Sequence, residues 1–200
     1  MQIIEPFSYI FGQEKIEYDT SELKKEKLIA NSSKQGEAPR LEAFRILEKY
    51  PDIKDRINES FNNFIKEAFL WETEFRVTTS WLTKLGKGES VHPHNHLNSF
   101  YSGLLYFDNY TDDDCELRFQ NPIKDSMPIA LGSSKKPNAM TKDIGIRPEN
   151  NLIVFFPSWI THYSLPNESK ERRSLAFNFM PRDSYGFSDS YFDPRWNINT

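Results

Sequence analysis

The sequence predicts a mainly β fold, a sandwich or barrel of short strands with helices in front of it. Beyond residue 71, segments rich in β-branched and aromatic residues alternate with turn-forming runs of glycine, proline, asparagine and aspartate. No helical pattern separates these segments, which argues against a parallel α/β sheet. Between residues 41 and 68, in contrast, apolar residues recur at steps of three and four, which is typical of helices with one buried face.

The helical part is expected to span about residues 40–69 and to support the strands. A first short run of helical spacing ends at Tyr50, because Pro51 interrupts it. The second run forms one apolar stripe from Ile53 to Ala68, with lysine, aspartate and asparagine at the other positions. Core packing explains such a stripe, so we assign it no chemistry.

The strand part is expected to span about residues 71–182 and to form, with the helical part, a single domain of residues 1–200. A chain of 200 residues is long enough to bury one sizeable core. The segments with strand character lie at residues 74–85, 100–107, 115–120, 151–159 and 172–180.

Charge and composition exclude several classes of partner. The formal net charge is -4 and the basic residues are scattered, which leaves no electrostatic footprint for nucleic acid or an anionic membrane. No apolar run approaches the roughly 20 residues that cross a bilayer, and the first residues lack the pattern of a signal peptide. The single cysteine, Cys115, excludes an internal disulfide. We therefore expect a cytoplasmic protein in a reducing setting.

Histidine is concentrated at two places in the chain. His92, His94 and His96 occupy alternate positions, and the only other histidine is His162. Alternate side chains of an extended segment share one face, so these imidazoles can converge on one point. A lone histidine is more often an ordinary core or surface residue, but two clusters that use all four histidines favour a metal site.

The last predicted strand has a polar face. Successive side chains of a strand point to opposite sides, so Arg172 shares one face with Ser174, Ala176 and Asn178, and Arg173 lies on the other. An arginine, a serine and an asparagine are therefore expected to face the same side.

Three segments form a joint pattern: HNHLNSFYSGLLYF, FFPSWITH and RRSLAFN. Together they resemble the iron(II)- and 2-oxoglutarate-dependent oxygenases. More narrowly, they resemble a small family of such oxygenases found in bacteria and phages, distant from prolyl hydroxylases. The likeness covers about residues 78–180. It implies a double-stranded β-helix, the jelly roll of cupin-like proteins. It also implies Fe(II) and 2-oxoglutarate as cofactors, with dioxygen and a small-molecule or peptide substrate as partners.

The resemblance also implies a set of metal ligands. The hydroxylase pattern is a Gly-x-Gly turn followed by His-x-Asp, which places His94 at the histidine and His96 at the aspartate. His162 matches the distal histidine. Three ligands on one face of iron(II) would leave positions for the keto acid and for dioxygen.

Tyr106, Arg172 and Ser174 match the residues that bind the remote carboxylate of 2-oxoglutarate in this family. The planar guanidinium fork binds a carboxylate through two hydrogen bonds and stays charged at any working pH. Arg173 competes for this role, and the shared face with Ser174 decides for Arg172. Asn178 is expected to contact either the keto acid or a ligand histidine.

Several of these assignments stay open. His96 stands where the wider family has aspartate, so the metal could bind more weakly, or Asp112–Asp114 could supply a carboxylate from a nearby turn. In the alternative register, His92 and His94 supply the first two ligands in place of His94 and His96. Arg172 could instead form an ordinary ion pair with a nearby glutamate.

Three functions compete. The leading one is an oxidoreductase of the 2-oxoglutarate-dependent class, most simply a hydroxylase. The second is a three-histidine dioxygenase of the cupin type that uses no 2-oxoglutarate, although such chemistry needs no Arg-x-Ser pair. The third is a jelly roll that binds a metal or ligand without turnover.

Replacing His162 by Ala should abolish stoichiometric iron(II) binding and leave the fold intact, because we expect the site at the mouth of the barrel and not in the packed core. Equilibrium dialysis of iron(II) measures this. The control is His92→Ala, which should change binding much less. Equal losses from the two substitutions would favour the His92–His94 register.

Overall fold

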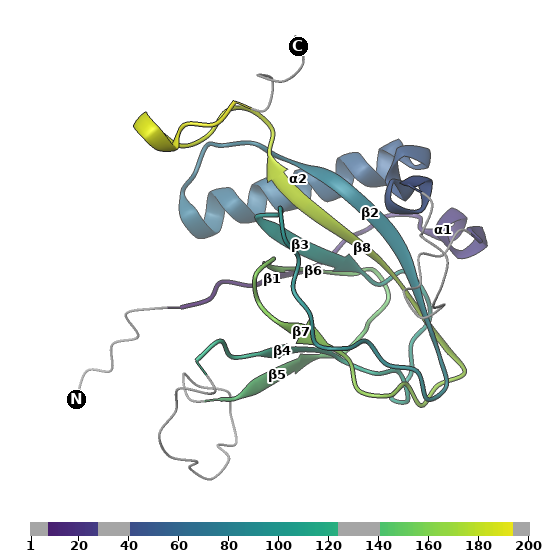
Figure 1. Ribbon diagram of the computed structural model, residues 1–200. Helices are drawn as coiled ribbons and strands as arrows, with labels where there is room; N and C mark the ends of the chain where they lie inside the picture. The colour runs from purple at the N-terminus through teal and green to yellow at the C-terminus, as the bar shows by residue number, and fades with distance from the viewer. Residues whose placement is uncertain (1–7, 28–40, 124–140, 194–200) are drawn as a thin grey trace.

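The structure is a computed structural model that describes residues 8–27, 41–123 and 141–193. Two antiparallel sheets face each other, and the longest helix covers the outer face of the larger sheet (Figure 1). The larger sheet has the strand order β1-β6-β3-β8-β2, and the smaller sheet has the order β5-β4-β7. In chain order the elements are β1 (Gly12–Lys15), α1 (Ser21–Lys25), η1 (Leu41–Phe44), η2 (Ile46–Lys49), α2 (Pro51–Phe69), β2 (Phe75–Gly86), β3 (Tyr101–Leu105), β4 (Leu117–Gln120), β5 (Asp143–Ile146), β6 (Leu152–Pro157), β7 (His162–Tyr163), β8 (Glu171–Pro181) and η4 (Ser188–Ser190).

The predicted mainly β fold is confirmed, and the five predicted strands are present as β2, β3, β4, β6 and β8. Strands β1, β5 and β7 were not predicted. Gln13, Glu14 and Lys15 of β1 are exposed at the edge of the larger sheet, so no apolar alternation marks them. Strand β7 has only two residues, too few for a pattern. Strand β1 also precedes the helices, which we had expected to come first.

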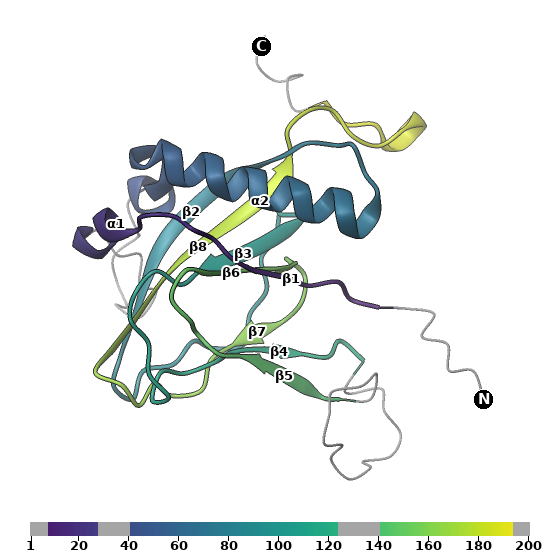
Figure 2. The same cartoon turned by 180° about the vertical axis from the view of Figure 1, so that it is seen from behind.

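The first core lies between α2 and the larger sheet (Figure 2). Ile53, Ile57, Phe61 and Ile65 of the predicted stripe are buried in it. The fully buried ring of Phe61 stacks on Phe179 of β8, with 3.8 Å between the ring centroids. No helix in the described ranges, α2 included, combines the length and the apolarity of a membrane span.

The second core fills the space between the two sheets, and β8 contributes to both cores. Leu175 and Phe177 pack with α2, whereas Ala176 packs between the sheets. The even-numbered residues from Arg172 to Asn178 share the side of Ala176, because side chains alternate along a strand. The polar face that the sequence predicts therefore points into the space between the sheets.

A β-bulge changes which side chains of β2 face inward. Phe75 and Val77 pack on the α2 side, but the pairing with β8 shifts register between Val77 and Thr79. After this shift Leu82 packs on the α2 side, and Trp81 packs between the sheets. The extra residue thus turns Thr79 and Trp81 toward the space between the sheets.

Truncating Phe61 to Ala should lower the free energy of unfolding by about 3–5 kcal/mol, because it removes a fully buried ring and leaves a cavity. Urea denaturation measures the loss. Glu67→Ala, on the exposed side of the same helix, is the matched control and should change the value by less than about 0.5 kcal/mol. Similar values for the two variants would contradict the view that this ring anchors α2 to the sheet.

Candidate metal centre

Two backbone hydrogen bonds hold the histidine segments together. The His94 N–H donates to the His162 carbonyl at 3.0 Å, and the His162 N–H donates back to the His94 carbonyl at 2.8 Å. The His96 N–H donates to the carbonyl of Ser158 at 2.9 Å. The segment before β3 is thereby fixed against the turn that joins β6 to β7.

Three of the four histidines converge. The potential ligand nitrogens of His94, His96 and His162 all lie within 4.8 Å of one another. The Nε2 atoms of His94 and His96 are 3.4 Å apart. His162 is buried, His96 is half-buried and His94 is exposed, so the cluster opens to solvent on the side of His94. His92 is exposed and lies outside the cluster, so the structure brings together the His94–His96 pair.

Hydrogen bonds at Nδ1 orient two of the imidazoles through the backbone. The Nδ1 of His94 lies 2.8 Å from the His92 carbonyl oxygen, and that of His162 lies 3.0 Å from the Ile160 carbonyl oxygen. A carbonyl only accepts, so each Nδ1 carries the proton. The lone pair of Nε2 is then left for a metal ion, which is the arrangement of a histidine ligand.

His96 is oriented by side chains instead. Its Nδ1 lies 2.7 Å from the amide oxygen of Asn178 and 2.8 Å from the hydroxyl of Ser102. Of the two partners that the sequence left open for Asn178, the structure shows the contact with a histidine.

Burial keeps two of the three imidazoles uncharged, those of His162 and His96. Burial lowers the pKa of His162 to about 3, and the nearby His94 acts in the same direction. Burial also lowers the pKa of His96 and outweighs the opposite effect of its hydrogen bond to Asn178. Neutral imidazole is the form that binds a metal, so both rings are in that form at neutral pH.

The acidic turn between β3 and β4 is engaged elsewhere. The Asp114 carboxylate accepts hydrogen bonds from the Thr111 N–H and the Ser169 hydroxyl, both at 2.7 Å. The Asp112 carboxylate lies 3.3 Å from the guanidinium of Arg147. Among the described residues no carboxylate joins the histidine cluster. The alternative in which this turn supplies a ligand is therefore not supported, and the three convergent groups are all imidazoles.

Arg172 is a buried cation on the inner face of β8. It is 4% exposed, one terminal nitrogen donates to the Tyr106 hydroxyl at 2.8 Å, and its Nε has no partner. Within the described ranges it forms no ion pair, since the neighbouring Glu171 contacts Lys84 at 3.2 Å. An unpaired buried charge is costly, and an anionic ligand that pairs with this guanidinium would remove that cost. The Tyr106 hydroxyl accepts from Arg172, and its own proton is available to the same ligand.

Ser174 lies two residues along the same face, and its hydroxyl is 2.7 Å from that of Thr83. The sequence did not predict Thr83, Ser102 or Trp81 as residues of the site. The ring centroids of Trp81 and His96 are 5.4 Å apart. The sequence could have predicted Ser102, because it is an even number of residues from Tyr106 in the same predicted strand and so faces the same side. It could not have predicted the β2 residues, because their direction depends on the bulge.

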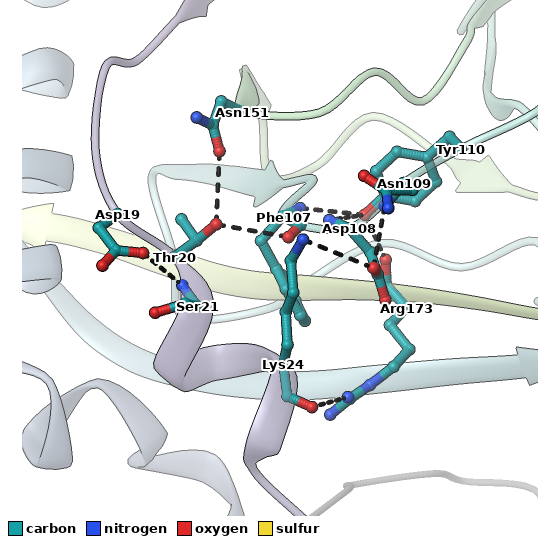
Figure 3. A network of polar contacts seen from close by, with 10 residues as sticks. All are labelled: Asp19, Thr20, Ser21, Lys24, Phe107, Asp108, Asn109, Tyr110, Asn151 and Arg173. Atoms are coloured by element: carbon teal, nitrogen blue, oxygen red, sulfur yellow. Dashed lines mark hydrogen bonds and ion pairs between the residues drawn. The ribbon is translucent and has the colours of Figure 1, made fainter.

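Arg173 is engaged on the opposite side of β8. Its terminal nitrogens donate to the carbonyls of Lys24 and Glu26 at the end of α1, both at 2.7 Å. Its guanidinium lies over the ring of Phe107, 5.6 Å from the centroid. Figure 3 shows this arginine beside Lys24, with the Tyr110 hydroxyl donating to its carbonyl. Arg173 therefore fastens α1 to the sheet and faces away from the histidines.

Comparison with protein families gives one match, over residues 79–178, which is half of the chain. The matched family is described as "Putative 2OG-Fe(II) oxygenase". The range includes the three convergent histidines and the inner face of β8. No curated protein is similar enough to match the chain.

Solved structures of similar fold include a prolyl-4-hydroxylase from Pseudomonas putida, with a TM-score of 0.52 and 17% identity over 94% of this chain and 89% of that one. A 2OG-Fe(II) oxygenase family oxidoreductase from Burkholderia pseudomallei has a TM-score of 0.47 and 11% identity, and covers 65% of this chain and 56% of its own. Iron-bound HygX from Streptomyces hygroscopicus has a TM-score of 0.47 and 10% identity, over 70% of this chain and 71% of that one. The chain thus spans little more than half of the Burkholderia protein. The likeness to the hydroxylase confirms the jelly roll, whose two sheets do not close into a barrel in the described residues.

The free energy of unfolding of the metal-free protein should fall as the pH drops from about 6.5 toward 3. The pKa of His162 is about 3 in the folded protein, whereas a histidine of the unfolded chain titrates near 6.5, so the unfolded state binds more protons between these values. One such group contributes at most about 1.4 kcal/mol per pH unit.

Urea denaturation with a chelator, at pH 7 and pH 5, measures this slope. His162→Gln should reduce the dependence on pH, whereas His92→Gln, at an exposed position, should leave it unchanged. An unchanged slope in His162→Gln would show that the buried imidazole is not the group that titrates.

Proposed function

Since the chain belongs to the 2OG-Fe(II) oxygenase family, we propose that it hydroxylates its substrate and couples this step to the decarboxylation of 2-oxoglutarate. Family membership makes the protein an oxidoreductase with iron(II) and 2-oxoglutarate as cofactors. The observation that carries the proposal is the buried Arg172, which has no carboxylate partner among the described residues. Its side of β8 is also the side on which Asn178 contacts His96.

We propose His94, His96 and His162 as the iron ligands. Their orientation supports this role, because Nδ1 of each ring is held by a hydrogen bond and Nε2 is left for the metal. Ligands on one face leave coordination positions for the keto acid and dioxygen. When bound, iron(II), 2-oxoglutarate and dioxygen supply the oxidising chemistry, and the protein positions the reactants.

Arg172, Tyr106 and Ser174 are proposed to hold the remote carboxylate of 2-oxoglutarate. The guanidinium fork supplies two parallel donors, and the Tyr106 hydroxyl supplies a third. Burial raises the pKa of Tyr106, so its hydroxyl remains a donor at neutral pH. The site excludes water around Arg172, which strengthens its attraction for an anion.

We propose that residues 1–200 act as one domain on a small-molecule or peptide substrate in the cytoplasm. The core shared by the two sheets supports a single domain. The unpaired, buried Cys115 is compatible with a reducing compartment.

The all-histidine cluster favours a second candidate, a cupin-type dioxygenase that uses no keto acid. In that case 2-oxoglutarate would neither bind beside the metal nor be consumed. A protein that binds iron(II) and 2-oxoglutarate but never releases succinate would instead be a jelly roll without turnover.

Replacing Arg172 by Gln should weaken 2-oxoglutarate binding at least tenfold and leave iron binding unchanged, because it removes a buried charge-assisted contact of about 2–5 kcal/mol. Anaerobic titration of the iron(II) protein with 2-oxoglutarate, followed by its visible charge-transfer band, measures the affinity. Succinate release without substrate tests turnover.

The matched control is Arg173→Gln, which loosens α1 and should lower stability without changing the affinity for 2-oxoglutarate. A loss of affinity from Arg173→Gln alone would mean that the 2-oxoglutarate pocket lies on the other side of β8.

A further inference from the structure

A row of three polar residues crosses the larger sheet behind His96. Asn178 on β8 pairs with Thr79 on β2 and with Ser102 on β3, so the three lie side by side on neighbouring strands. Ser102 is fully buried. Its hydroxyl therefore needs partners within the protein, because water cannot supply them.

The Asn178 amide lies along this row, with its nitrogen toward β2 and its oxygen toward β3. Its nitrogen donates to the Thr79 hydroxyl at 3.0 Å, and its oxygen accepts from the Ser102 hydroxyl at 2.7 Å. The same oxygen lies 2.7 Å from Nδ1 of His96. When His96 binds a metal through Nε2, its Nδ1 carries the proton, so the amide must present its accepting oxygen to that proton.

Ser102 is compatible with the same tautomer. Its hydroxyl lies 2.8 Å from that of Ser158, which donates to Ser99 at 2.8 Å. Ser99 in turn donates to the carbonyl of Tyr101 at 2.9 Å, where the chain ends at an acceptor. With its proton on the amide oxygen, Ser102 keeps an oxygen lone pair that can accept from His96.

His96 differs in this respect from the other two histidines. His94 and His162 each use a backbone carbonyl two residues earlier in the chain, which no substitution removes. His96 depends on the side chains of Asn178 and Ser102.

We propose that Asn178 is the positioning residue of His96: its amide oxygen, aimed by Thr79 and Ser102, holds the imidazole with Nε2 toward the metal. This inference rests on the proposed function, since it assumes that His96 is a ligand. It assigns Asn178 to the metal site and not to the keto acid. It also gives the β-bulge of β2 a role, because without the extra residue Thr79 would face α2.

The test is a titration of the metal-free protein with cobalt(II), followed by its visible absorption. Asn178→Leu keeps the approximate volume but removes the acceptor, and should weaken cobalt(II) binding by about 10- to 100-fold. Asn178→Asp restores an acceptor and should bind at least as tightly as the parent. In the His96→Asp background there is no Nδ1–H to hold, so Asn178→Leu should change the affinity by no more than about twofold.

A second readout is independent of metal loading. Nitrogen-15 NMR of the metal-free parent at neutral pH should show His96 with its proton on Nδ1, and Asn178→Leu should lose that preference. If Asn178→Leu does not fold, Thr79→Val takes its place, and it should weaken both the tautomer preference and cobalt(II) binding.

Three results would overturn the inference. They are an Nε2–H tautomer in the parent, unchanged cobalt(II) affinity in Asn178→Leu, and an equal loss in the parent and His96→Asp backgrounds. A parent that binds no cobalt(II), or that still binds it after His162→Ala, would instead overturn the proposed metal site itself.

Discussion

The alternation of side chains along β8 is the constraint on which the rest of the structure depends. One side of this strand must be apolar, because α2 packs there with Phe61 stacked on Phe179. The other side is then free to carry Arg172 and Asn178 into the space between the sheets. A shift of one residue would bury the polar groups under the helix and turn the aromatic rings into the space between the sheets. The aromatic core thus sets the register of the polar groups as well as the stability of the sheet.

The polar groups between the sheets are arranged so that almost all of them have partners. His94 and His162 use backbone carbonyls, and Asn178 and Ser102 satisfy one another and His96. Such networks hold ligand side chains in a single orientation, which reduces the cost of ordering them when a metal binds. The unpartnered Nε of Arg172 is therefore informative, since it lies in a region where other buried groups are satisfied.

Charge distinguishes the two ends of the proposed site. Three imidazoles offer a divalent ion no negative charge, and Arg172 adds a buried positive charge. Under the proposed function, the two carboxylates of 2-oxoglutarate, one at the iron and one at Arg172, offset two of these three positive charges. Metal binding and 2-oxoglutarate binding should then be mutually favourable, because each supplies charge that the other lacks.

The sequence by itself determined the parts of this protein that follow from local periodicity. The stripe of α2, the five predicted strands and the inward face of β8 are all visible as steps of two, three or four residues. Contacts between distant segments were decided only by the tertiary structure. The polar strand β1 exists because β6 offers it a partner, and the choice of His94 over His92 follows from the backbone bridge to His162. The β-bulge that turns Thr79 toward Asn178 has no periodic signature, because it arises from the pairing of two strands that are about 100 residues apart in the chain.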